Sequence, residues 1–181
     1  NSTGFVIEAG RAIFNNATGS GSGKNKLQVN GGATIGGTGF LGGDSAHANY
    51  GILVQGGSTS SRAAVEPGSV DPATGASLTG TLTVGSATAP NTGTFGAHSR
   101  LNLQIGAEGA SDKLDVYGTL DLASTSDSLA LTVDPEAKAG VYTLVSASGG
   151  VIGTFNAIDT AKPGLLTQTA TTVEYTVPPS A

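Results

Sequence analysis

The amino-acid sequence predicts an all-β protein built as an elongated β-solenoid. Three observations support this prediction. Short units that alternate apolar and polar residues follow one another along the chain, and helical periodicity is nearly absent. Glycine supplies 29 of the 181 residues, well above its usual share of about 7%. Aromatic residues make up only 5%, and tryptophan, methionine and cysteine are absent, which suits a narrow core that each coil buries against the next.

The predicted strands are short alternating runs, each bounded by glycine, asparagine, proline or a cluster of serine and threonine. They are expected near residues 5–8, 11–14, 26–29, 33–35, 51–55, 62–65, 80–84, 94–96, 100–105, 113–117, 119–123, 128–133, 140–146, 151–155, 164–168 and 172–177. Residues 69–73 (SVDPA) and 134–139 (DPEAKA) have the length for one helical turn. We expect both to form turns instead, because proline follows aspartate in each.

The alternating units repeat within the chain. Residues 26–31 (KLQVNG) match 113–118 (KLDVYG), 80–84 (GTLTV) match 118–122 (GTLDL), and 52–57 (ILVQGG) are a looser copy of 27–32 (LQVNGG). Apolar residues spaced by two point to one face of a strand, so they are predicted to fill the core. The residue between them faces outward and varies, as Gln28, Thr83 and Asp115 do. Glycine then turns the chain between sheets, where a positive φ or a close backbone approach is needed.

No linker divides the sequence, so we predict a single domain over residues 1–181. Residues 1–62 are glycine-rich repeats, residues 63–177 contain the longer alternating units, and residues 178–181 form a tail. Exposed loops are expected at residues 18–25 and 85–93. At about 20–25 residues per coil, about eight coils would fit into this length.

Charge and composition limit the partners and the compartment. The net charge is −5, so the chain lacks the basic stripe needed for nucleic acid or an anionic lipid surface. No apolar run approaches the roughly 20 residues of a membrane helix. The lack of cysteine, with a composition rich in Gly, Thr, Ser and Asn, is typical of bacterial proteins exported without disulfides, and we expect an extracellular location on a cell surface. Because the sequence has no signal peptide and starts at Asn1, we interpret it as a processed product or a piece of a longer protein.

A series of blocks in the second part of the chain resembles a known family. The blocks are residues 64–69 (AVEPGS), 80–85 (GTLTVG), 101–106 (LNLQIG), 111–122 (SDKLDVYGTLDL), 129–133 (LALTV) and 139–155 (AGVYTLVSASGGVIGTF). In this order they resemble the autotransporter-associated β-strand repeat, found in the passenger domains of bacterial autotransporters and in related exported surface proteins. The resemblance covers residues 63–177 and implies a right-handed parallel β-helix. The chain departs from the pattern in that no translocator barrel follows residue 177. Its tail (VPPSA) resembles only the beginning of a PEP-type sorting signal.

Two motifs with possible chemistry are incomplete. Residues 18–25 (TGSGSGKN) approach a phosphate-binding loop, but Thr18 replaces its first glycine and Asn25 replaces its final Ser or Thr. Residues 36–41 (GGTGFL) begin like a calcium-binding nonapeptide, with Leu41 where the aspartate should stand. We interpret the first as a loop and the second as corner glycines, and we predict no cofactor and no metal.

The titratable residues do not predict an enzyme. Most acidic residues are expected on solvated faces and at turns rather than in a catalytic pair or a calcium site, namely Glu108, Asp112, Asp115, Asp121, Asp127, Asp134 and Glu136. His47 and His98 are expected in exposed loops, and no GxSxG nucleophile motif accompanies them. Among the aromatic residues, Phe95 and Phe155 are expected in the core, and Tyr117 at a strand end is the candidate for stacking on a sugar.

These observations favour a structural function. The sequence predicts a non-enzymatic extracellular protein, a β-solenoid stalk, spacer or filament subunit on a bacterial surface. An open solenoid offers unpaired backbone groups at both ends, so residues 1–14 and 164–177 are expected to contact other copies or neighbouring domains. The residues predicted for this contact are Phe5, Val6, Ile7, Ile13, Phe14, Leu165, Leu166, Val173, Tyr175 and Val177. The alternative is an adhesin module that binds a glycan or matrix ligand through the loops at 15–25, 42–50 and 85–99.

Overall fold

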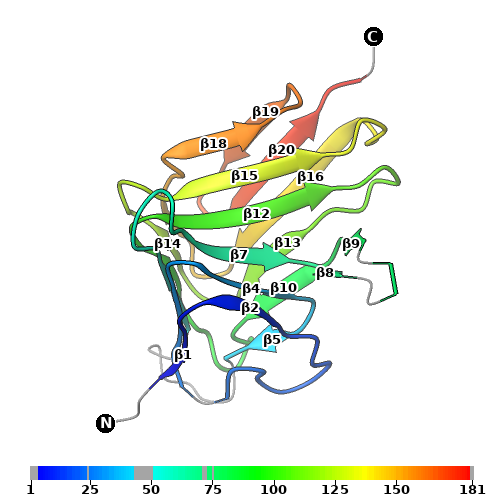
Figure 1. Cartoon of the computed structure of the whole chain (residues 1–181). Coiled ribbons are helices and arrows are strands. Elements are labelled where there is room, and N and C mark those ends of the chain that lie inside the picture. The colour runs from blue at the N-terminus through cyan, green and yellow to red at the C-terminus, as the bar shows by residue number, and fades with distance from the viewer. Residues whose placement is uncertain (1–3, 24, 43–50, 71–72, 75, 180–181) are drawn as a thin grey trace.

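The computed structural model describes residues 4–23, 25–42, 51–70, 73–74 and 76–179. In this part of the chain there are only strands, turns and irregular segments, as Figure 1 shows. The strands form three six-stranded sheets and one two-stranded sheet. The predicted all-β class is confirmed.

The three large sheets are called A, B and C. Sheet A contains β1 (Phe5–Ile7), β3 (Leu27–Asn30), β6 (Ile52–Gln55), β11 (Gly93–Phe95), β14 (Leu120–Leu122) and β17 (Val151–Gly153). Sheet B contains β2 (Gly10–Ile13), β4 (Ala33–Gly37), β7 (Ala63–Pro67), β12 (Ser99–Ile105), β15 (Ser128–Val133) and β18 (Ala157–Thr160). Sheet C contains β5 (Phe40–Leu41), β10 (Thr81–Val84), β13 (Lys113–Val116), β16 (Gly140–Ala147), β20 (Thr172–Val177) and β19 (Leu165–Gln168). A small antiparallel pair, β8 (Ser69–Val70) and β9 (Ser77–Leu78), lies between β7 and β10 in the chain.

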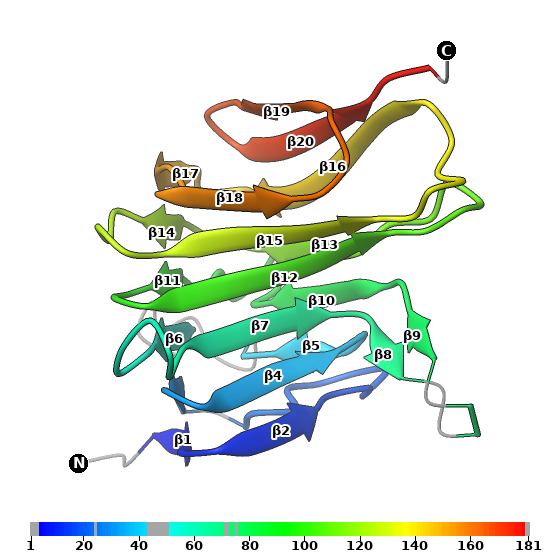
Figure 2. The same cartoon turned by 45° about the horizontal axis from the view of Figure 1, so that its top comes forward.

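The chain visits the three sheets in turn, and one pass through A, B and C is called a coil (Figure 2). Every pair in sheets A and B is parallel. Sheet C is parallel from β5 to β16 and then continues with two antiparallel pairs, β16 with β20 and β20 with β19. Three mainly parallel sheets in this order are compatible with a β-solenoid.

The coils are fewer and larger than predicted. Each large sheet has six strands, so the expected count of eight coils is wrong. One cause is the β8–β9 hairpin, which lengthens the coil between β6 and β11. At the usual strand spacing of about 4.8 Å, six strands span roughly 24 Å. The described coils therefore form a short stack rather than an elongated one.

The predicted strands recur with shifts of one or two residues, but four short strands were not predicted: β5, β8, β9 and β18. The sequence repeat also differs from the structural repeat. Residues 27–29 lie on β3 of sheet A, whereas the matching residues 114–116 lie on β13 of sheet C. By contrast, β3 and its looser copy β6 pair directly, with Leu27 opposite Ile52.

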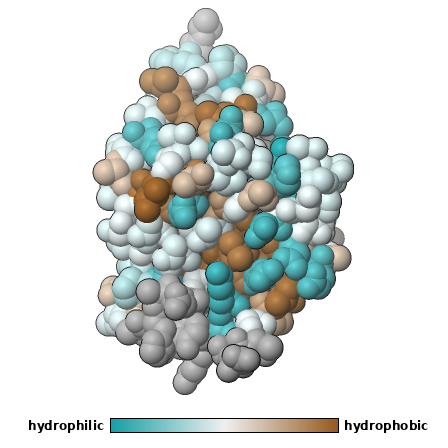
Figure 3. Space-filling model, turned by 90° about the vertical axis from the view of Figure 1, so that its left-hand side faces the viewer, coloured by the Kyte–Doolittle hydropathy of each residue, from teal (hydrophilic) through white to brown (hydrophobic). Residues whose placement is uncertain are grey.

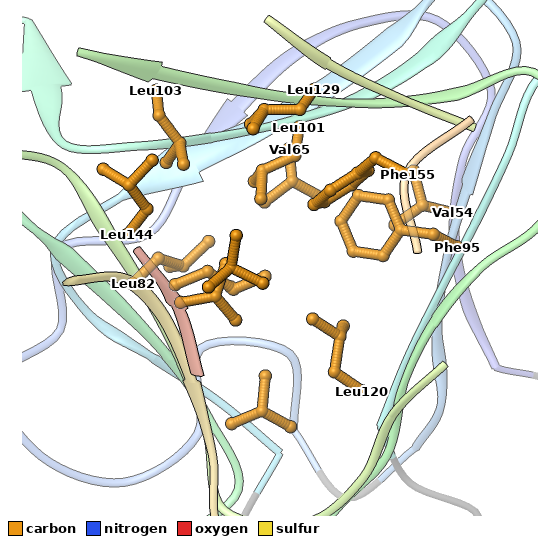
Figure 4. Close-up of a cluster of buried hydrophobic side chains, with 14 of the residues drawn as sticks. Val54, Val65, Leu82, Phe95, Leu101, Leu103, Leu120, Leu129, Leu144 and Phe155 are labelled. Atoms are coloured by element: carbon orange, nitrogen blue, oxygen red, sulfur yellow. The ribbon is translucent and has the colours of Figure 1, made fainter. Parts of the chain in front are cut away.

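The core is a column of inward-facing side chains between the three sheets (Figure 4). Alternation along each strand sets this direction, as in β12, where Leu101, Leu103 and Ile105 are buried and the residues between them are partly exposed. Phe95 and Phe155, both expected in the core, are buried with their rings edge to face, 6.3 Å apart. The narrow core predicted from the scarcity of aromatic residues is thus filled mainly by Leu, Val and Ile.

Glycine occupies corners where successive coils come into backbone contact. A Cβ atom on Gly118 would lie 2.4 Å from the carbonyl oxygen of Asn91 in the preceding coil. A Cβ atom on Gly149 would lie 2.7 Å from the carbonyl carbon of Gly118. The predicted corner role of glycine is confirmed here, because no other residue fits between these backbones.

Candidate functional site

The two ends of the coil stack are the first candidate surface, because sheet edges can pair with further strands. At one end, β1 and β2 are the edge strands of sheets A and B (Figure 1). The N–H groups of Phe5, Gly10 and Phe14 bond inward to the next coil, at 3.0, 3.3 and 2.8 Å. Alternate residues of a parallel strand bond to opposite neighbours. The backbone groups of Val6, Arg11 and Ile13 therefore face away from the stack and have no partner among the described residues.

This N-terminal end is also apolar. Phe5, Val6 and Ile13 are exposed by 48%, 41% and 39%, and Ile7 and Phe14 are partly buried against the core. All five belong to the predicted contact residues, and the structure gathers them at one end. They are the residues of the described chain on which strand addition at this end would depend.

Sheet C is closed at this end by the chain itself. Residues 14–23 run past the outer edge of β5, and the Gly21 N–H donates to the carbonyl oxygen of Phe40 at 2.7 Å. The side chain of Asn16 donates to the same oxygen at 3.1 Å. Within the described part of the chain, the open edge at the N-terminal end therefore consists of β1 and β2.

At the opposite end the β19–β20 hairpin covers the outer edges of sheets A and C, whereas β18, the last strand of sheet B, pairs only with β15 among the described residues. The turn of the hairpin reaches over the corner before β17, where the Val151 N–H donates to the carbonyl oxygen of Ala170 at 2.8 Å. The side-chain amide of Gln168 donates to the carbonyl oxygen of Gly153 at 2.6 Å. Both are backbone groups of β17 that face away from β14. The hairpin thus occupies the outer edge of sheet A as well as that of sheet C.

The C-terminal contact residues predicted from the sequence fall into two groups. Val173, Tyr175 and Val177 are buried in the chain's own core, so they do not form an outer surface. Leu165 is 64% exposed, and Leu166 is partly buried against the core. Sequence reasoning missed Ile152 and Ile158, which are exposed by 54% and 49% on β17 and β18. The sequence did contain an indication of them, because both are large apolar residues in the last parallel strands of the stack.

Figure 3 shows the left-hand side of the molecule, where apolar residues gather in separate patches divided by polar ones. The exposed apolar residues at the two ends of the stack are considered strand by strand, because no single large apolar face appears in this view. They lie on edge strands rather than on a continuous apolar face.

A second candidate surface is a groove of about 470 Å³ on the outer side of sheet B. Its lining residues are Glu66, Arg100, Asn102, Leu103, Gln104, Asp112, Ala130 and Thr132. Two of its three ionisable residues are held in ion pairs: Glu66 with Arg11 at 3.0 Å and Arg100 with Asp159 at 2.9 Å. The groove presents the amides of Asn102 and Gln104 between these pairs.

Two of the acidic residues expected on solvated faces are buried instead, Asp112 and Asp127, exposed by only 3% and 1%. The Asp112 carboxylate accepts the N–H groups of Gly80 and Gln104, each at 2.9 Å. Burial is the main cause that raises the pKa of Asp112 to about 7. The hydrogen bonds from the two N–H groups lower this pKa, and the nearby charge of Glu66 raises it by a smaller amount. Burial likewise raises the pKa of Asp127, whose carboxylate accepts two bonds from Asn156. The prediction was wrong for these two because both side chains turn inward at corners.

Asp112 predicts a pH dependence of stability. Folding raises the pKa of Asp112 above its ordinary value of 3.8. The contribution of this residue to the free energy of unfolding is therefore fully present below pH 3.8 and is lost as the pH rises through about 7. Between pH 4 and 8 the free energy of unfolding is expected to fall by on the order of 2 kcal/mol on this account. Urea unfolding followed by circular dichroism measures the slope. Asp112→Asn should flatten it, Glu108→Gln at an exposed loop should not, and an unchanged slope in Asp112→Asn would contradict the assignment.

In the described part of the chain, the remaining candidate residues are not brought together into a catalytic, sugar-stacking or metal-binding site. His98 lies at a corner with a φ of 53°, half-buried, and its backbone N–H donates to Ser126 at 3.1 Å. His47 and most of the loop at 42–50 lie outside the described residues. Tyr142 and Tyr175 are buried and Tyr117 is half-buried, so these three do not form an exposed stacking surface. Among described residues, no group of three or more His, Asp or Glu is placed to hold a metal ion.

None of the described residues forms a helix long and apolar enough to span a membrane. Comparison with known proteins finds no family model that matches this chain and no match among curated proteins.

Proposed function

We propose that this chain is a non-enzymatic structural segment of an extracellular protein, a right-handed parallel β-helix that serves as a stalk or spacer on a bacterial surface. The observation that carries the proposal is the continuity of the three ladders. Sheets A and B each join six coils by parallel pairing, over one shared apolar core. Each inner coil is held by its two neighbours, which is how a solenoid gains stiffness with short strands.

The outer surface supports this role. Outward positions on the inner strands of sheet A are mostly polar, such as Gln28, Thr94 and Asp121. The resemblance of residues 63–177 to the autotransporter-associated repeat supports the same location and the handedness of the helix. A filament subunit is the related form of this proposal, and it depends on whether copies can join end to end.

The adhesin alternative is favoured by one observation, the groove on sheet B. Asn102, Gln104 and Thr132 line it with hydrogen-bonding groups that have no side-chain partner in the described structure. Such groups suit the hydroxyls of a neutral glycan. The surface would then be the outer side of a sheet rather than the loops predicted from the sequence.

Immunogold electron microscopy of cells that make this protein tests the proposal. A stalk or spacer should be labelled outside the cell envelope, and label confined to the cytoplasm would contradict it. In parallel, the purified chain is titrated with a panel of neutral and acidic oligosaccharides by calorimetry. Saturable binding that Asn102→Ala removes and Gln28→Ala retains would favour the adhesin, whereas the structural role predicts no saturable binding.

A further inference from the structure

The two ends of the stack differ in what covers them. At the N-terminal end the outward backbone groups of β1 and β2 are unpaired in the described structure. At the C-terminal end two outward groups of β17, the Val151 N–H and the Gly153 carbonyl oxygen, are bonded by Ala170 and Gln168, while β18 pairs only with β15 in the described structure. We propose that the β19–β20 hairpin is an end cap that stops a second copy of this chain from adding its β1 to β17. This inference rests on the proposed structural function.

The edge that the hairpin covers matches β1. Extending the register of sheet A by one strand would place Phe5, Val6 and Ile7 of a second copy beside Val151, Ile152 and Gly153. The inward rows would then continue, with Phe5 following Leu120 and Val151. Ile7 would lie over Gly153, which leaves room for a larger side chain.

The outward row of sheet A points to the same partner. Its members in order are Val6, Gln28, Leu53, Thr94, Asp121 and Ile152. The two terminal members are the most exposed of the row and both are β-branched and apolar. End-to-end addition would bring Ile152 of one copy beside Val6 of the next and remove both from water, as aliphatic neighbours on adjacent strands do.

The hairpin blocks this joint in two ways. It bonds the Val151 N–H and the Gly153 carbonyl oxygen, two outward groups of β17, and it extends sheet C. Sheets A and B begin in the first coil, but sheet C begins with β5 in the second, and all three have six strands. β19 therefore lies one strand beyond β17 and β18, where it would meet an incoming copy. Such covering of a sheet edge is a known means of preventing edge-to-edge association.

Leu166 anchors the cap. It is partly buried against the core and lies opposite Tyr175, which is buried and donates its hydroxyl to the carbonyl oxygen of Lys162 at 2.6 Å. The adjacent residue, Thr167, is exposed on the other face of β19. An aspartate at 166 should lift β19 from the core, whereas an aspartate at 167 should remain in water.

Size-exclusion chromatography with light scattering, followed by negative-stain electron microscopy, tests the cap. Leu166→Asp is expected to form larger, concentration-dependent species, while the unsubstituted chain and Thr167→Asp share a smaller mass. Adding Phe5→Asp to Leu166→Asp should restore that smaller mass, because it charges the strand that docks. Circular dichroism confirms folding, and Leu166→Ser, which also weakens the contact of β19 with the core, provides the same test if Leu166→Asp does not fold.

The proposal is overturned if the cap variant that folds keeps the mass of the unsubstituted chain while hydrogen exchange shows its Val151 amide released. It is also overturned if the larger species persist with Phe5→Asp, since the joint would then not use β1. Neither result bears on the location of the protein outside the cell, so the structural function is judged separately by immunogold labelling.

Discussion

Replacing Phe95 by alanine is expected to lower the free energy of unfolding by about 3–5 kcal/mol. Phe95 is 1% exposed on β11, in the middle of sheet A, and its ring packs edge to face with Phe155 from the last coil. Truncation would remove buried apolar surface and leave a cavity that three sheets cannot close. Because the core is narrow, few neighbouring side chains are available to move into the space. Chemical unfolding followed by circular dichroism measures the loss.

Phe5→Ala is the matched control for this prediction. It removes the same ring from the same sheet, but at the open N-terminal end, where Phe5 is 48% exposed. The expected loss is below about 1.5 kcal/mol, since much of the ring is already in water. Equal losses for the two variants would show that Phe95 is not part of a closed core.

Replacing Gly118 by alanine is expected to cost about 3 kcal/mol, at the upper end of overpacking effects. The new methyl group would lie within 3.0 Å of the nitrogen, carbonyl carbon and oxygen of Asn91. These are backbone atoms of the preceding coil, so no side chain can rotate away to relieve the contact. The two coils would have to separate at this corner, which weakens the ladders on either side. Unfolding in urea gives the change directly.

Gly57→Ala provides the control at another corner. A Cβ atom on Gly57 meets nothing within 4 Å, and its φ lies outside the left-handed region. Alanine there is expected to be neutral or to stabilise by about 0.5 kcal/mol, through the unfolded chain. If Gly118→Ala were equally neutral, the corner glycines would not be set by contact between coils.

The sequence predicted the N-terminal part of the candidate surface better than the C-terminal part. Phe5 and Val6 are exposed on β1, an edge strand of sheet A, as predicted. Val173 and Tyr175 alternate in the same way, yet they are buried, because β20 runs antiparallel to β16 and is covered by β19. Alternation reports which residues share a face of a strand, but it does not report the direction of the strand or its neighbours.

The sequence by itself determined the all-β class, the inward and outward positions and the glycine corners, because alternation and residue size act within a few neighbouring residues. Tertiary structure decided which sheet each unit joins. The similar units at 27–29 and 114–116 lie in sheets A and C, because the strands of both sheets need two inward-facing apolar residues and the local pattern does not distinguish them. It also decided the burial of Asp112, whose bonding partners Gly80 and Gln104 come from different coils. The cap over β17 likewise depends on contacts between strands that no local pattern specifies.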